Sequence, residues 1–126
     1  MHKPIVITAS ILICLSIIFG AFGAHSLKDL VEAGALEIFD KGVKYQMYTG
    51  LALLAIGLTA DKSNFELKWF FRLTLIGVII FSGMLYLLTF KEYNESLKIC
   101  GAIVPIGGTL MIISWIILIV KLIRSK

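Results

Sequence analysis

Charged residues are scarce in this chain. Of its 126 residues only 16% are Asp, Glu, Lys or Arg, whereas 59% are hydrophobic. Soluble domains contain about a quarter charged residues, so the composition excludes an ordinary water-soluble domain. Histidine and cysteine are also rare, with two of each. A zinc site needs three or four Cys, His or carboxylate ligands within reach of one another. We therefore expect no metal site and no cofactor.

Four apolar runs account for this composition, and each approaches the roughly 20 residues that a helix needs to cross a bilayer. Helices satisfy their own backbone hydrogen bonds in lipid, and the alternation typical of a membrane barrel is absent. The runs cover residues 4–24, 43–60, 70–90 and 99–120. The sequence predicts an all-α integral membrane protein, a single domain of residues 1–126 folded as a four-helix transmembrane bundle. A signal peptide is the alternative for the first run, but its core of about 7–15 residues would be shorter.

The connection between the first two runs, residues 26–41, carries a helical pattern. Ser26 followed by Asp29 resembles a capping box, and apolar residues such as Leu27 and Val31 are interspersed with charged ones. We expect a short amphipathic helix here, between the first two transmembrane helices. It would rest on the membrane surface or bind a partner, and the alternative that it folds back into the bundle stays open.

Lys and Arg in short loops predict the orientation, because these residues favour the cytoplasmic side. Four spans place both termini and the middle connection on one side, with seven Lys and Arg against five on the other. The seven are Lys3, Lys62, Lys68, Arg72, Lys121, Arg124 and Lys126, and the five are Lys28, Lys41, Lys44, Lys91 and Lys98. We expect a plasma-membrane protein with cytoplasmic termini. Its basic residues form no cluster of the kind that binds nucleic acid, so the expected partners are membrane lipids, other membrane proteins or a second copy.

Small residues recur along every run at spacings that place them on one helix face. Gly20 and Ala24, for example, are four residues apart, and such pairs let two helix backbones approach closely in lipid. Positions where we expect close helix packing are Gly20, Gly23, Ala24, Gly50, Gly57, Gly77, Gly83, Gly101, Gly107 and Gly108. Cys14 and Cys100 fall at depths roughly 15 Å apart along the bundle, too far for a disulfide, and are expected to be free thiols.

Polar residues of the runs fall mainly on the side away from the termini. His25 directly follows the first run, and we predict that it points inward onto Tyr45, Gln46 or Tyr48. Pro105 removes a backbone donor, so the carbonyl of Gly101 needs another partner, which Tyr48 or Tyr86 could supply. The expected outer-leaflet cluster, serving either structure or a ligand, is His25, Tyr45, Gln46, Tyr48, Thr49, Ser82, Tyr86 and Pro105.

Four short motifs, one in or beside each run, are similar to those of a known family. "GAFGAH" at 20–25, "YQMY" at 45–48, "FSGMLY" at 81–86 and "PIGG" at 105–108 followed by Trp115 resemble the small membrane proteins of the domain-of-unknown-function 423 family. The resemblance implies a multi-span bundle in the bacterial inner membrane, with relatives in mitochondria, and no established activity. The family's tyrosine motif commonly continues into a histidine, where this chain has Thr49.

These observations favour a protein that is not an enzyme, and we expect no catalytic residues. No charged residue lies in the middle of a run, although proton relays and ion pathways depend on such groups. The predicted function is that of an accessory, assembly or lipid-binding scaffold that uses the polar outer-leaflet corner. The alternative is a small oligomeric transporter or channel with His25, Tyr45, Gln46 and Tyr48 at its entry. A polar passage past Ser82 would favour transport, and a closed interior would favour the scaffold.

Overall fold

The computed structural model describes residues 1–62 and 66–125, and for Lys62 it describes the backbone alone. Lys126, counted above for orientation, lies outside the described residues. Within them are four α-helices, α1 (Lys3–His25), α2 (Ala33–Leu58), α3 (Lys68–Leu88) and α4 (Cys100–Arg124). Short 3-10 helices occupy the connections at Leu27–Asp29 (η1), Ala60–Lys62 (η2) and Glu95–Ile99 (η3).

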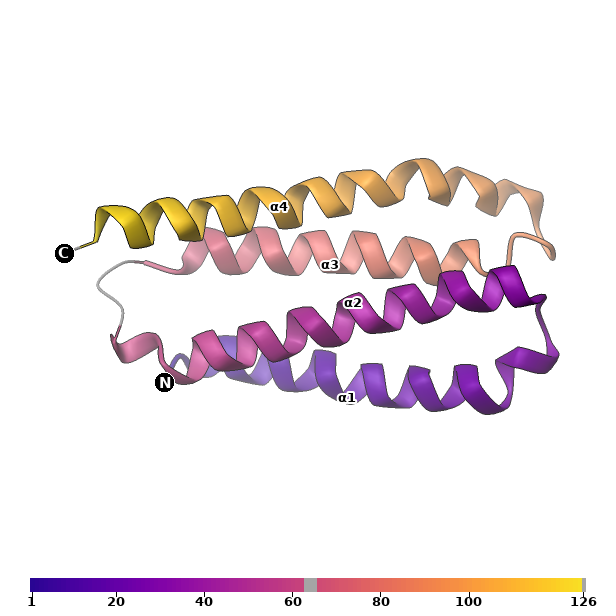
Figure 1. Cartoon of the computed structure of the whole chain (residues 1–126), viewed down its shortest axis with the longest axis horizontal. Coiled ribbons are helices and arrows are strands. Elements are labelled where there is room, and N and C mark those ends of the chain that lie inside the picture. Colours follow the sequence, from indigo (N-terminus) through magenta and orange to yellow (C-terminus); the bar gives the residue numbers. More distant parts are fainter. Residues whose placement is uncertain (63–65, 126) are drawn as a thin grey trace.

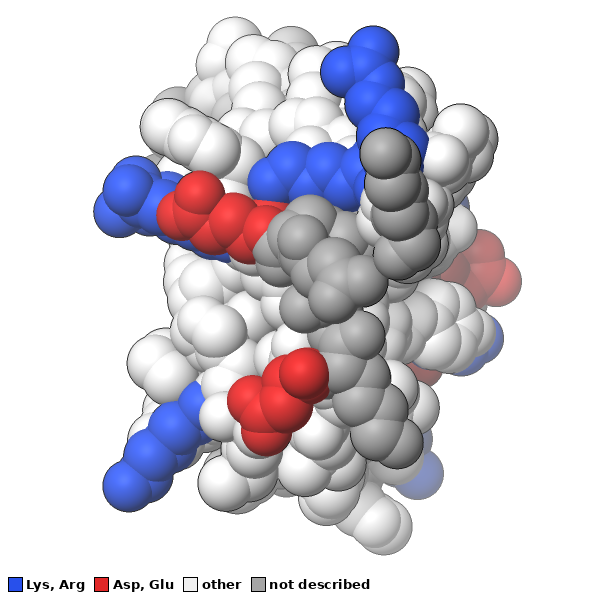
Figure 2. Space-filling view, turned by 90° about the vertical axis from the view of Figure 1, so that its left-hand side faces the viewer, with Lys and Arg blue, Asp and Glu red and all other residues white. Residues whose placement is uncertain are grey.

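The four α-helices lie side by side with alternating direction, so both termini are at the same end (Figure 1). We call this the terminal end, and the opposite end, which holds η1 and η3, the loop end. Figure 2 looks onto the terminal end and shows Lys, Arg, Asp and Glu side chains spread over it. The long sides of α1 and α4 instead expose isoleucines such as Ile17, Ile112 and Ile116. This distribution fits a molecule whose flanks face lipid and whose ends face water.

Helices that follow one another in the sequence also pack against one another. α1 packs on α2, α2 on α3, and α3 on α4, which leaves α1 and α4 at opposite edges (Figure 1). All four helices contribute to an apolar core that is densest toward the terminal end. The buried members of that core are Ile5, Ala9, Leu12, Leu53, Leu67, Phe70, Val78 and Leu118.

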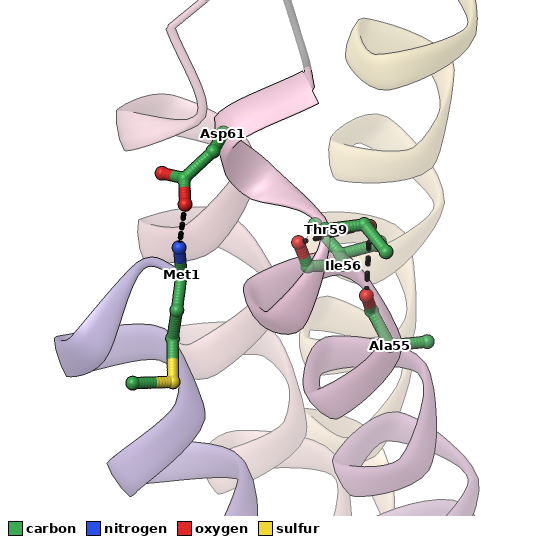
Figure 3. Close-up of polar contacts among 5 residues, drawn as sticks. All are labelled: Met1, Ala55, Ile56, Thr59 and Asp61. Atoms are coloured by element: carbon green, nitrogen blue, oxygen red, sulfur yellow. Dashed lines mark hydrogen bonds and ion pairs between the residues drawn. The ribbon is translucent and has the colours of Figure 1, made fainter.

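The start of α1 is tied to the end of α2. The backbone N–H of His2 donates to the carbonyl of Gly57 at 2.8 Å, and its Nδ1 accepts from the N–H of Ile5 at 3.4 Å, capping α1. The N-terminal ammonium of Met1 pairs with the carboxylate of Asp61 in η2 (Figure 3).

The structure of residues 26–41 differs from the prediction of a short amphipathic helix between the first two transmembrane helices, because no separate helix of that kind forms. α1 ends at His25, a single 3-10 turn follows, and α2 begins at Ala33, ten residues before the apolar run at 43–60. Ser26 makes no side-chain capping bond. The amphipathic pattern belongs to α2 itself: Ala35, Phe39 and Gly42 are buried at spacings of four and three residues, the repeat of one helix face.

Three helical segments are long and apolar enough to cross a membrane: Lys3–Asp29, Lys68–Leu88 and Glu95–Arg124. α2 is not among those found in the described residues, although its 26 residues are enough in length. Its half near the loop end carries Asp40, Lys41 and Lys44, which lower its average hydropathy. The helix boundaries of α1, α3 and α4 lie within a few residues of the predicted runs.

Glycine packing is tightest between α3 and α4. A Cβ added to Gly107 would lie 2.5 Å from the backbone nitrogen of Phe81 and 2.7 Å from the carbonyl oxygen of Gly77. One added to Gly77 would lie 2.9 Å from the carbonyl oxygen of Gly107. Since these neighbours are backbone atoms, the two helices touch main chain to main chain here, as the small-residue spacing predicts.

The other predicted glycines divide into close and ordinary contacts. Between α1 and α2, a Cβ on Gly50 or Gly57 would meet Ile13 or Val6 at 2.9 Å, and Gly23 lies close to the ring of Phe39. The remaining four would meet nothing closer than 3.5 Å, so the prediction of tight packing is wrong for Gly20, Gly83, Gly101 and Gly108. Ala24 is exposed. Cys14 is exposed and Cys100 buried, both as free thiols.

Candidate functional site

Gln46 joins three helices near the middle of the molecule. On α2 and only 5% exposed, it donates from Nε2 to the carbonyl of Leu12 on α1 at 3.0 Å. Its Oε1 accepts from the hydroxyl of Tyr86 on α3 at 2.5 Å. The carbonyl of Leu12 also accepts from Ser16 at 2.8 Å. A buried amide needs such partners, because an unpaired polar group in an apolar interior costs about 1–3 kcal/mol.

Tyr86 reaches this position because helical side chains tilt toward the N-terminus of their helix. Although Tyr86 is near the loop end of α3, its ring passes over Gly42 of α2, where an added Cβ would be 2.7 Å from the ring. The ring also contacts Phe19 and Phe39, with centroids 5.2 and 5.0 Å away. One turn along, Ser82 donates to the carbonyl of Gly42 at 2.8 Å. Gly42 therefore provides the space for the tyrosine.

Sequence reasoning missed Gly42, because it lay at the edge of the assumed connection. It also missed a second polar pair, in which Thr74 of α3 donates to the hydroxyl of Ser114 on α4 at 2.8 Å. Ser114 in turn donates to the carbonyl of Met111 at 2.6 Å. A signal was available: Thr74 and Ser114 lie a few residues from the terminal end of two antiparallel runs, which brings them to similar depth.

The predicted corner around His25 does not form. His25 is exposed at the loop end of α1, whereas Gln46 binds α1 at Leu12, 25 − 12 = 13 residues away. At 1.5 Å per residue this separation is about 20 Å, far beyond hydrogen-bond reach. The error has one physical cause. α2 starts at Ala33 and not at the apolar run, so Tyr45 and its neighbours lie deep along the helix and not at its entry.

The other predicted site residues separate into buried and exposed ones. Thr49 is 5% exposed on the same helix as Gln46. Tyr45 and Tyr48 are 43% and 58% exposed; their rings contact each other, and the ring of Tyr45 also contacts that of Phe81 on α3. Pro105 is exposed on α4, which continues through it. Since the hydroxyl of Tyr86 binds Gln46, the expected contact of this tyrosine with the carbonyl of Gly101 is not made. The structure thus unites Gln46, Ser82 and Tyr86.

Toward the terminal end, the interior below Gln46 is filled. α3 and α4 touch at Gly77 and Gly107, and the apolar core, to which all four helices contribute, occupies the interior toward the terminal end. Among the described residues every buried side-chain nitrogen and oxygen has a hydrogen-bond partner. The same residues contain no group of three or more His, Cys, Asp or Glu placed to hold a metal ion.

A groove of about 380 Å³ lies between α1 and α2 toward the loop end. Its α1 wall consists of small residues, Gly20, Gly23 and Ala24, and its floor includes the rings of Phe19 and Phe39. We call it the α1/α2 groove. On α2 its rim carries two carboxylates, and Asp40 is paired with Lys44 at 3.0 Å. Of the small residues that the sequence suggested would pack inside the bundle, Gly23 is buried against Phe39, whereas Ala24 is exposed at this hollow.

Comparison with known proteins agrees with the motif resemblance. The family model described as "Protein of unknown function (DUF423)" matches residues 19–108. A UPF0382 membrane protein of Staphylococcus saprophyticus is 37% identical over 94% of this chain and 95% of its own length. The UPF0382 membrane protein YwdK of Bacillus subtilis is 35% identical over 97% and 98%, and one of Haemophilus influenzae is 42% identical over 85% and 83%. No solved structure matches. The chain therefore belongs to the DUF423 family of membrane proteins.

Proposed function

We propose that this protein is a non-enzymatic scaffold of the bacterial plasma membrane that binds a transmembrane helix of a partner protein in the α1/α2 groove. The observation that carries the proposal is the contrast between a filled interior and an open flank. Buried polar side chains are engaged with one another or with the backbone, whereas the groove leaves apolar surface uncovered.

The shape of the groove suits a helix better than a loosely held lipid chain. Gly20 and Ala24 are four residues apart on α1, and both line the groove. This spacing permits close approach of a second helix backbone, which increases dispersion contacts that lipid tails make less well. The carboxylates of Glu37 and Asp40 at the rim lie near the loop end, where they would meet basic residues at the end of a partner helix.

Four spans with cytoplasmic termini form the second part of the proposal. α2 packs on α1 and on α3, so its buried polar residues Gln46 and Thr49 have protein neighbours, and its charged residues Asp40, Lys41 and Lys44 lie toward the loop end. A helix sheltered in this way tolerates polar residues that a helix surrounded by lipid does not. The excess of Lys and Arg at the terminal end supports a cytoplasmic position for that end.

The interior argues against the transporter alternative. A transport path would need polar or charged groups along a passage, and the contact of Gly77 with Gly107 leaves no room for one between α3 and α4. No specific observation favours a channel over the scaffold.

Filling the groove tests the proposal. Ala24→Leu would place a larger side chain in the groove, and because Ala24 is exposed the fold should tolerate it. Ile17→Phe, on an exposed position of the same helix outside the groove, is the matched control. Tagged wild-type protein and both variants would be purified in mild detergent after in-cell crosslinking. The proposal predicts a protein adduct that Ala24→Leu loses and Ile17→Phe keeps. An adduct pattern unaffected by Ala24→Leu would contradict it.

A further inference from the structure

A second hollow, of about 500 Å³, lies at the terminal end beside the last turns of α4. Its inner wall is apolar and consists of Ile116, Ile117 and Val120. Its mouth carries Lys121 and Arg124, one turn further along the same helix. The wall continues into the exposed isoleucine surface of α4, of which Ile116 is 52% exposed. The hollow thus changes from apolar to basic where the membrane would change from acyl chains to headgroups.

The two cations differ in how they are held. Lys121 is half-buried, and its Nζ donates to the backbone carbonyl of Glu66 at 2.5 Å. This bond fixes the ammonium at the mouth and leaves two of its three hydrogens for another acceptor. Arg124 is exposed, and it forms no ion pair within residues 1–62 and 66–125. Its planar guanidinium matches two oxygens of a phosphate at once.

One carboxylate and the end of a helix dipole oppose these cations. Glu66 lines it and is exposed, so its carboxylate offsets one of the two cations. The last carbonyls of α4 place partial negative charge nearby, although two of them accept from the N–H of Ser125. The mouth therefore keeps an excess of one positive charge, on a surface where Figure 2 shows several Lys and Arg side chains.

We propose that this hollow binds one anionic phospholipid, with its phosphate on Lys121 and Arg124 and an acyl chain along Ile116, Ile117 and Val120. An excess positive charge above an apolar wall is complementary to an anionic amphiphile. A zwitterionic lipid has no net charge for this excess to attract. A free phosphate ion would leave the apolar wall unused. The site is at the opposite end from the α1/α2 groove and does not depend on the proposed scaffold function.

The test measures lipid preference directly. Purified protein in mild detergent would receive phosphatidylglycerol or phosphatidylcholine, and native mass spectrometry would give the ratio of bound to free protein for each. The wild-type protein should prefer phosphatidylglycerol. Because each basic residue near a lipid surface contributes about 1 kcal/mol, removing both cations should reduce the preference about 30-fold. The double variant is Lys121→Gln with Arg124→Gln. Arg124→Gln alone keeps the bond from Lys121 to Glu66 and should reduce the preference for phosphatidylglycerol about fivefold.

Three further variants separate the site from general electrostatics. Lys91→Gln with Lys98→Gln removes the same charge at the loop end and should leave the preference unchanged. Glu66→Gln removes the opposing carboxylate and should increase the preference for phosphatidylglycerol. Val120→Trp fills the apolar wall but keeps both cations, and it should weaken phosphatidylglycerol binding.

Each contrary result would overturn the proposal. An equal loss in the Lys91 and Lys98 variant would show that charge alone attracts the lipid. Unchanged binding in Val120→Trp, or displacement of phosphatidylglycerol by added inorganic phosphate, would show that the mouth binds phosphate without an acyl chain. An unchanged preference in Arg124→Gln would exclude the assigned headgroup contact.

Discussion

Adding one methyl group at Gly107 should separate two helices. The new Cβ of Gly107→Ala would lie 2.5 Å from the backbone nitrogen of Phe81 and 2.7 Å from the carbonyl oxygen of Gly77. Ordinary contact begins at 3.4 Å, so a shift of 3.4 − 2.5 = 0.9 Å is needed. Neither neighbour is a flexible side chain, and α3 or α4 must move as a unit. A gap of roughly 0.5–1 Å forfeits a quarter to a half of each dispersion contact around it.

The expected loss in the free energy of unfolding is about 2–3 kcal/mol, the upper part of the range for overpacked cores. Gly108→Ala is the matched control, because its Cβ would lie 3.5 Å from the ring of Phe81, an ordinary contact. Alanine is a better helix former than glycine by about 1 kcal/mol. Gly108→Ala should therefore be neutral or stabilising. The same methyl group on adjacent residues would have opposite effects.

Equilibrium unfolding with a rising fraction of SDS in mixed micelles, followed by far-ultraviolet circular dichroism, measures this difference. The two variants have the same composition, so effects of detergent on the unfolded chain cancel between them. Equal stability of Gly107→Ala and the wild-type protein would refute the main-chain contact between α3 and α4. A loss in Gly108→Ala as large as that in Gly107→Ala would refute the assignment of the contact to one face of α4.

Further predictions concern the polar network, the ion pair and the topology. Tyr86→Phe should lower the free energy of unfolding by about 1–2 kcal/mol, because it removes the donor to Gln46. In a Gln46→Leu background the same change should be neutral or favourable, and a double-mutant cycle measures the coupling. Asp61→Asn should cost less than about 1 kcal/mol in the SDS titration, since both members of its ion pair are more than half exposed. In a cysteine-free background of intact cells, Asn94→Cys should react with an impermeant maleimide and Ser125→Cys should not. The reverse labelling pattern would invert the proposed topology.

Hydropathy was sufficient to predict α1, α3 and α4, because each of these helices begins and ends within a few residues of an apolar run. It failed at the start of α2. Glu37, Asp40 and Lys41 interrupt the apolar pattern and suggested a surface connection, yet they lie on the exposed side of a continuous helix whose buried side includes Phe39. Charge on one face does not end a helix when the other face is packed. The ten-residue error displaced every depth estimate on α2 by about 15 Å.

The spacing of glycines in the sequence also could not show which of them lie at helix contacts. Gly107 and Gly108 are adjacent, and their directions differ by about 100° on the helix. Which of them contacts α3 depends on the rotation of α4 about its axis, which is set by contacts along its length, including that of Phe70 with Trp115 at 5.1 Å. The sequence predicted a small-residue contact between these helices and left its register undetermined. Gln46 and Tyr86 were correctly grouped for a different reason: a buried amide and a phenol at membrane depth must find partners.

The position of α2 between α1 and α3 has a consequence for biogenesis. In the four-span arrangement proposed above, α2 is the segment with the least tendency to leave the translocon on its own, since its Asp40, Lys41 and Lys44 oppose partitioning into lipid. Its amide at Gln46 gains an acceptor only when the Leu12 carbonyl of α1 is beside it. We therefore expect α1 and α2 to enter the bilayer together as a hairpin, with α1 supplying the partner that the polar side chain of α2 needs.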